Sequence, residues 1–279
     1  MAVVGVLSPC AAIHANKALS PGARRAARAE KYMRNKTKGQ YEPLGHVASV
    51  GHLNRRSYSG WKALHNEPHR KINDHKAEHA VQVTARYLNL PWGVVPPTIL
   101  DSKGASIRPW IDPLESFKGE SYAWENRLEE KIFSAAKENL DRIDWESIHS
   151  VLLLDFVVGQ ADRRSQNVFF RVRKGKFTAI ALDNEYAFGR RVVRPGPSAY
   201  ESEHGKILRS AIESNPNAIE PRRLSSRLRD ALKELDVNEW KEAMLEAGMK
   251  EGAVKAAAER LLLTKEKGLA AIFSELEPQ

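Results

Sequence analysis

The chain has 279 residues, of which 42% are hydrophobic and 28% are charged, a composition typical of a folded globular protein with a sizeable core. Its single cysteine, Cys10, excludes a disulfide framework and a Cys-based zinc site and fits a reducing compartment. No apolar run approaches the ~20 residues that a membrane helix needs, and the N-terminus lacks the basic stretch of an export signal, so we expect a cytoplasmic protein without a transmembrane segment.

The net charge of +9 is concentrated in residues 1–40, which carry a net charge of +7. A short helix rich in Ala and Arg is expected there, from Gly22 to Asn35. A basic arm of this kind can contact polyanions such as nucleic acid, an anionic lipid surface or an acidic partner. A solvated, partly disordered tail is the alternative, and the sequence leaves both open.

Residues 41–64 contain short β-prone runs separated by glycines, and they predict strands. The segment 45–51 is either a phosphate-approaching loop or a plain hairpin. A helix is expected to begin after Asp74, with an apolar stripe that ends before Pro91, and it carries Glu78 beside the stripe.

Two further strands are predicted at Val94–Leu100 and Ser106–Ile111. The next helix has Asp144 as its N-cap, apolar residues at helical spacing over 145–158, and Gly159 as its stop.

A polar loop and a predicted hairpin follow this helix. The strands 168–172 and 177–182 would bring Asn167, which precedes the first strand, close to Asp183, which follows the second. Asp162 lies on the preceding loop. Hard oxygen donors suit magnesium, and a further carboxylate can orient an acceptor hydroxyl. Loop Asp and Asn are often only turn residues, but the order of all these features favours a phosphoryl-transfer site.

Two segments resemble a known family. Residues 159–167, GQADRRSQN, resemble the G-x-x-D-R-x-x-x-N loop of phosphatidylinositol 3-/4-kinase-like enzymes, and HipA-type bacterial protein kinases share the D-R-x-x-x-N part. Residues 181–188, ALDNEYAF, are similar to the I-D-N-G-L-A-F segment of type II phosphatidylinositol 4-kinases and their bacterial relatives. The resemblance covers about residues 45–190 and suggests a bacterial or phage type of atypical kinase.

The resemblance implies an α+β, two-lobed protein-kinase-like fold. The basic arm would be followed by a small β-rich N-lobe with one main helix, residues 41–113, and a larger helical C-lobe, residues 114–279. The chain departs from ordinary protein kinases at two places. Gln160 and Ala161 stand where those enzymes have His-Arg, and Asn184-Glu185 follows the metal-binding Asp in place of Phe-Gly, so a Phe-driven switch is not expected.

The same resemblance implies roles for individual residues, with ATP and Mg²⁺ as cofactors. Asp162 would be the catalytic base or acceptor-orienting carboxylate, and Asn167 and Asp183 would bind magnesium. Lys62 would contact the nucleotide phosphates, with Glu78 pairing to it. A lone Lys or helical Glu is also a common surface residue, so these two roles stay open against that alternative.

A second similarity supports Glu78 over the nearby Glu67. The segment from Glu78 to Leu90, followed by Val94-Val95-Pro96-Pro97-Thr98, resembles actinobacterial phosphatidylinositol-kinase-like sequences. The hinge between lobes, where backbone groups would bind the adenine, is then expected at Pro109, Trp110, Ile111 and Asp112.

The chain from Glu201 onward predicts helices without a catalytic motif, at Arg223–Leu235, Glu239–Ala247 and Ala253–Leu276. His75 and His79 have helical i, i+4 spacing, but no third ligand accompanies them, so we do not expect a zinc site.

Two functions are compatible with these patterns. The first is an ATP- and Mg²⁺-dependent kinase acting on an unknown hydroxyl acceptor; a protein Ser/Thr is favoured over a lipid because no membrane-insertion segment is visible. The second is a catalytically inactive kinase-like binding or scaffold module whose basic arm binds nucleic acid or a partner protein. The polar metal and acceptor positions favour the first, and the poor phosphate loop favours the second.

Overall fold

The computed structural model describes residues 42–43, 51–58, 61–66, 75–91, 93–96, 98–100, 106–109, 138–160, 163, 168–173, 175–182, 184, 186–188, 203–215, 217–273 and 276. The strands before residue 110 are described as backbone only. The basic arm, the candidate loop 45–51 except its last residue, and the Asp74 cap lie outside this set.

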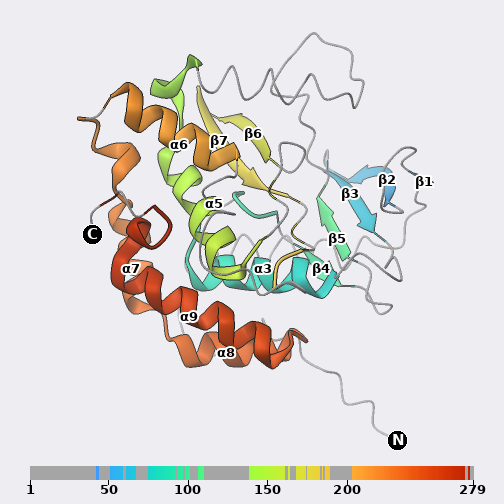
Figure 1. The fold of residues 1–279 in the computed structure, drawn as a ribbon. Coiled ribbons are helices and arrows are strands. Elements are labelled where there is room, and N and C mark those ends of the chain that lie inside the picture. The colour runs from blue at the N-terminus through green and yellow to red at the C-terminus, as the bar shows by residue number, and fades with distance from the viewer. Residues whose placement is uncertain are drawn as a thin grey trace, which may run out of the picture.

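An antiparallel sheet of five strands comes first in the chain and lies to one side of the molecule (Figure 1). Its spatial order is β1-β2-β3-β5-β4, so β5 pairs with β3 and β4 with β5. The strands are β1 (Glu42–Pro43), β2 (Gly51–Tyr58), β3 (Trp61–Asn66), β4 (Ile99–Leu100) and β5 (Ser106–Pro109).

The predicted helix before Pro91 is confirmed as α3 (His75–Tyr87). It contacts β4 and β5 as well as two helices of the second half of the chain, α5 and α8. Its small apolar residues Ala77, Ala80 and Val81 are completely buried. A polar contact supplements this packing, because Trp240 Nε1 donates to Thr84 Oγ1 at 3.2 Å. The helix therefore connects the sheet to the helical part of the molecule.

The strand predicted at Val94–Leu100 is mostly wrong, because only β4, its last two residues, pairs with another strand. Val94 and Val95 are buried within a bend, and Val94 instead accepts a hydrogen bond from Ala181 N–H at 2.7 Å. Two prolines follow directly and cannot donate to a ladder. The second predicted strand is confirmed over Ser106–Pro109, and its last two positions, Trp110 and Ile111, lie outside the described residues.

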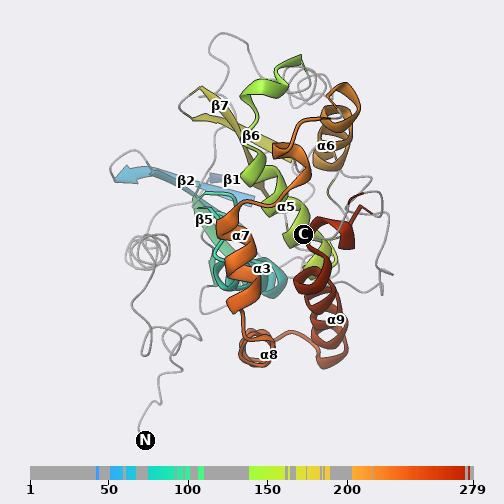
Figure 2. The same cartoon turned by 90° about the vertical axis from the view of Figure 1, so that its left-hand side faces the viewer.

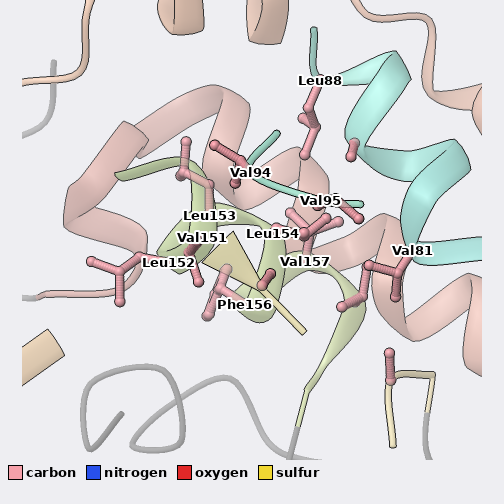
Figure 3. Close-up of a cluster of buried hydrophobic side chains, with 14 of the residues drawn as sticks. Val81, Leu88, Val94, Val95, Val151, Leu152, Leu153, Leu154, Phe156 and Val157 are labelled. Carbon is pink, nitrogen blue, oxygen red and sulfur yellow. The ribbon is translucent and has the colours of Figure 1, made fainter. Parts of the chain in front are cut away.

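The predicted helix α5 (Trp145–Val158) is confirmed and lies at the centre of the helical part (Figure 2). Asp144 caps its N-terminus by accepting from Ser147 N–H. All its residues from Ser147 to Val158 are buried, including the polar residues Ser147, His149, Ser150 and Asp155. Figure 3 shows α5 side chains facing Val81 and Leu88 of the α3 region.

A two-stranded antiparallel hairpin follows α5 and packs against it. Its strands are β6 (Val168–Arg173) and β7 (Lys176–Ala181), close to the predicted bounds. Gly175 adopts φ +78° in the turn, a conformation that glycine adopts at low cost. A short 3₁₀ helix, η2 (Leu140–Arg142), precedes α5, and Arg142 donates to the Gly175 carbonyl.

Helices form most of the rest, with bounds set by local caps. They are α6 (Glu203–Ser214), η4 (Glu220–Arg222), α7 (Ser226–Glu234), α8 (Val237–Glu246), α9 (Glu251–Lys267) and η5 (Gly268–Ala271). Ser225 caps α7, and Asp236 caps α8, which therefore begins before Glu239. The predicted helix to Leu276 is wrong beyond Lys267, because Gly268 at φ +56° and ψ −132° ends α9. No described helix is both long and apolar enough to span a bilayer.

Candidate functional site

The C-terminus of α5 leads directly into the loop with the D-R-x-x-x-N pattern. Gly159 is in the left-handed conformation, with φ +64°, and forms a Schellman-type ending: its N–H donates to the Phe156 carbonyl, and Gln160 N–H donates to the Asp155 carbonyl at 2.9 Å. The other two terminal carbonyls, of Val157 and Val158, accept hydrogen bonds from residues that come much later in the sequence. Arg260 Nε donates to Val157 at 3.0 Å, and Phe188 N–H donates to Val158 at 2.8 Å. All four carbonyls that a helix end leaves open are thus paired.

Arg163, the residue after the candidate catalytic Asp162, forms a buried ion pair with Asp155 on α5. Its Nε and Nη2 donate to the two carboxylate oxygens at 2.9 and 2.8 Å, in the bidentate geometry that suits guanidinium and carboxylate. The side chains are 1% and 0% exposed, so water does not screen the pair. Burial raises the pKa of Asp155, while the charge and hydrogen bonds of Arg163 act in the opposite direction.

The same guanidinium reaches the residues on both sides of Asp183. Arg163 Nη1 donates to the carbonyl of Leu182, and Nη2 donates to Asn184 Oδ1 at 2.6 Å. One buried side chain therefore joins the D-R loop to the segment that the sequence identifies as metal-binding.

Asn184 continues this network toward α3. Its backbone N–H donates to Glu78 Oε1 at 2.7 Å, and its side-chain Nδ2 donates to Glu78 Oε2 and to the Ala181 carbonyl, both at 3.3 Å. Glu78 and Asn184 are buried. We name the set Asp155, Arg163, Asn184 and Glu78 the buried polar relay; it runs from α5 to α3 through the residues that follow Asp162 and Asp183.

The far end of the Asp183 segment is also held. Phe188, with φ +55°, donates its N–H to Val158 at the end of α5. Its ring stacks on Trp240 of α8, with the ring centroids 6.4 Å apart. The segment is thus fixed at Leu182 and Asn184 by Arg163 and Glu78, and at Phe188 by α5 and α8.

The three central candidate residues, Asp162, Asn167 and Asp183, lie outside the described residues. At least one immediate neighbour of each is described: Arg163, Val168, and both Leu182 and Asn184. Val168 pairs with Ala181 at the open end of the hairpin, so the chain enters β6 and leaves β7 at the same place. The Arg163 contacts bring the D-R loop to that place as well. The neighbours of all three candidates therefore converge on one region.

Two of the candidate nucleotide-binding residues, Lys62 and Pro109, belong to the sheet. Lys62 lies on β3, and its neighbour Ala63 pairs with Pro109 at the end of β5. Only the backbone of these strands is described, so the pairing of Lys62 with Glu78 stays a prediction. Trp110, Ile111 and Asp112 of the candidate hinge lie outside the described residues.

The described part of the chain contains no group of three or more His, Cys, Asp or Glu residues that could hold a metal ion. His79 Nδ1 lies 3.2 Å from the Thr98 carbonyl oxygen and can donate a hydrogen bond to it. This nitrogen therefore has a partner other than a metal. An Asn oxygen and an Asp carboxylate at Asn167 and Asp183 would form a hard donor set that suits Mg²⁺. The convergence of their neighbours is compatible with such a set.

Sequence reasoning assigned no role to Asp155, Arg163 or Asn184. One signal was present: Asp155 interrupts the most apolar stretch of the chain, and a carboxylate buried within such a stretch requires a partner. Nothing local identified Arg163 as that partner.

No protein-family model matches the sequence, and no curated protein matches it either. Among solved structures, the chain is similar to the crystal structure of the Helicobacter pylori proinflammatory kinase CtkA. The TM-score is 0.38 and the identity 12%, and the match covers 83% of this chain and 90% of that chain. A likeness this weak leaves the function to be judged from the residues of the chain itself.

Proposed function

We propose that this protein is an ATP- and Mg²⁺-dependent phosphotransferase of an atypical, two-lobed kinase-like fold, which transfers the γ-phosphate to a hydroxyl group. We favour a protein Ser or Thr over a lipid as the acceptor. We also propose that the chain is related to phosphatidylinositol-kinase-like enzymes and HipA-type kinases, as its sequence motifs suggest.

The observation that carries this proposal is the buried polar relay. Positions 163 and 184 each follow one of the two Asp residues that the motifs single out, and their side chains lie 2.6 Å apart in the interior. Burying two carboxylates, an amide and a guanidinium carries a desolvation cost. If Asp162 and Asp183 had unrelated roles, nothing would favour linking their neighbours at that cost. Because active sites require such fixed positions, the relay supports a catalytic interpretation.

The proposed mechanism assigns each residue one task. Asp162 orients the acceptor hydroxyl and accepts its proton. Lys62 contacts the phosphates from the sheet side, and Glu78 holds the segment after Asp183 from α3. Asn167 and Asp183 would hold magnesium, which supplies charge neutralisation at the phosphate oxygens. Transfer then depends mainly on positioning and on electrostatic stabilisation.

A thermal-shift titration with ATP, with and without Mg²⁺, tests the proposal. The wild type should be stabilised by Mg-ATP by a few kcal/mol at saturation, about 3 kcal/mol at one hundred times Kd. Asp183→Asn should lose the magnesium-dependent part. Asp230→Asn, at an exposed position on α7, is the matched control and should respond like the wild type.

An equal response of wild type and Asp183→Asn would contradict the assignment of Asp183. A wild type that binds no nucleotide under either condition would contradict the phosphotransferase itself and favour a non-catalytic binding module.

A further inference from the structure

Asn184, the residue after Asp183, is held in the interior by several hydrogen bonds. Asn184 uses its backbone N–H, both hydrogens of Nδ2 and its Oδ1 in hydrogen bonds, all within the interior. Its exposure is 1%. A buried amide with this many partners makes a specific demand on its surroundings, because each partner must stay in place to avoid an unsatisfied polar group.

The partners explain why a carboxamide occupies this position. Arg163 presents donors on one side and Glu78 presents acceptors on the other. Asn carries both an acceptor oxygen and a donor nitrogen, whereas Asp would place a second carboxylate against Glu78 and Leu would satisfy neither side. The charges on either side also fix which end of the amide faces which residue.

Resting on the proposed function, we infer that Asn184 is a positioning residue that sets the Asp183 segment for magnesium before the ion arrives. It does so by coupling Glu78 of α3 to Arg163 of the D-R loop through its side chain, while Phe188 anchors the other end of the segment to α5. Metal binding is then expected to carry a smaller ordering cost, because Leu182, Asn184 and Phe188 around Asp183 already have fixed partners.

Two variants separate positioning from a purely structural role. Asn184→Leu is similar in size and removes the side-chain hydrogen bonds but keeps the backbone N–H. Ser225→Ala is the control for lost stability, since it removes the N-cap of α7 and a hydrogen bond to Glu146, and none of these partners belongs to the relay or to the segment 182–188. Both should lower the melting temperature. Should Asn184→Leu fail to fold, Asn184→Ala removes the same contacts without adding volume.

The first readout is the Mg²⁺ concentration at half of the ATP-dependent thermal shift. The Asn184 variant should require about tenfold or more Mg²⁺, the size of effect expected when a partner behind a metal ligand is lost. ATP binding in EDTA should stay at the wild-type level, and Ser225→Ala should keep the wild-type Mg²⁺ requirement. The second readout is hydrogen exchange over 182–188, which should accelerate in the Asn184 variant and stay at the wild-type rate in Ser225→Ala.

The outcomes are distinct. A wild type without magnesium-dependent ATP binding overturns the proposed function and this inference with it. A wild type that binds Mg-ATP, together with an Asn184 variant of unchanged Mg²⁺ requirement, overturns the inference alone. A requirement that rises equally in Ser225→Ala would also overturn it, because a general loss of stability would then suffice.

Discussion

Glu78 and Asn184 are 106 positions apart in sequence, yet the backbone N–H of Asn184 donates to the Glu78 carboxylate at 2.7 Å. A single contact of this kind ties the main helix of the first half of the chain to the strand end that carries Asp183. The predictions below follow from this connection and from the packing around it.

Asp162→Ala should leave nucleotide binding largely unchanged and lower phosphoryl transfer by about a hundredfold or more, because Asp162 is proposed to act on the acceptor hydroxyl. ATP turnover and autophosphorylation, measured at saturating Mg-ATP, test this. Wild-type turnover in the variant would rule out the assigned role.

Asp155→Asn should destabilise the fold by about 3–5 kcal/mol, because it leaves the Arg163 guanidinium buried without its carboxylate. Urea unfolding measures the loss. The more exposed pair Arg227–Glu146, with side chains 40% and 33% exposed, provides the comparison, and Arg227→Gln should cost at most about 1 kcal/mol. Similar losses in the two variants would show that the Asp155 pair is not protected from solvent.

We predict that His149 lowers the stability of the fold as the pH falls. It is buried on α5, its Nε2 donates to the Pro221 carbonyl at 3.0 Å, and burial lowers its pKa to about 4. Above about pH 6.5 the imidazole is neutral in both the folded and unfolded states. As the pH falls from 6.5 to 4, the unfolded chain binds a proton that the folded chain does not, and the free energy of unfolding falls by about 3 kcal/mol.

His149→Gln keeps a donor for Pro221 but does not titrate, so its stability should fall less over the same interval. Unfolding free energies measured between pH 4 and 7 in both proteins test this. Identical slopes would exclude His149 as the source.

Gly159→Ala should cost about 1–3 kcal/mol, since residue 159 has φ +64° and an added Cβ would lie 2.8 Å from Arg260 Nη2. Gly252→Ala is the control, because its Cβ would meet open space within α9 and alanine is the better helix former. We expect that control to be neutral or slightly stabilising. Chemical denaturation of both variants decides the matter; a neutral Gly159→Ala would mean that the α5 ending adapts easily.

The sequence predicted those elements whose signals are local. Asp144 and Gly159 bracket α5 with a cap and a stop, and the hairpin has alternating β-prone residues around Gly175. Val94 and Val95 misled the strand prediction, because β-propensity reports burial as well as pairing, and here tertiary packing buries them in a bend.

The sequence motifs indicated where the candidate site lies but not how it is held. Glu78 was expected to pair with Lys62, which stays a prediction, and its contact with Asn184 was not foreseen. That contact depends on how α3 lies beside the residues that follow β7, which neither residue's neighbours in sequence determine. Arg260 likewise carries no motif, and its contact with Val157 follows only from the packing of α9 on α5.

The contact of Arg260 with the end of α5 has a consequence for the timing of synthesis. Arg260 is 103 residues beyond Val157, so the ribosome has made the entire D-R loop and hairpin long before α9 can close the helix end before that loop. Because chains fold as they emerge, from the N-terminus onward, the nascent protein would carry the first part of the chain with the end of α5 still incomplete. We therefore expect chains halted before Arg260 to lack the proposed activity, which would arise only after α9 has left the ribosome.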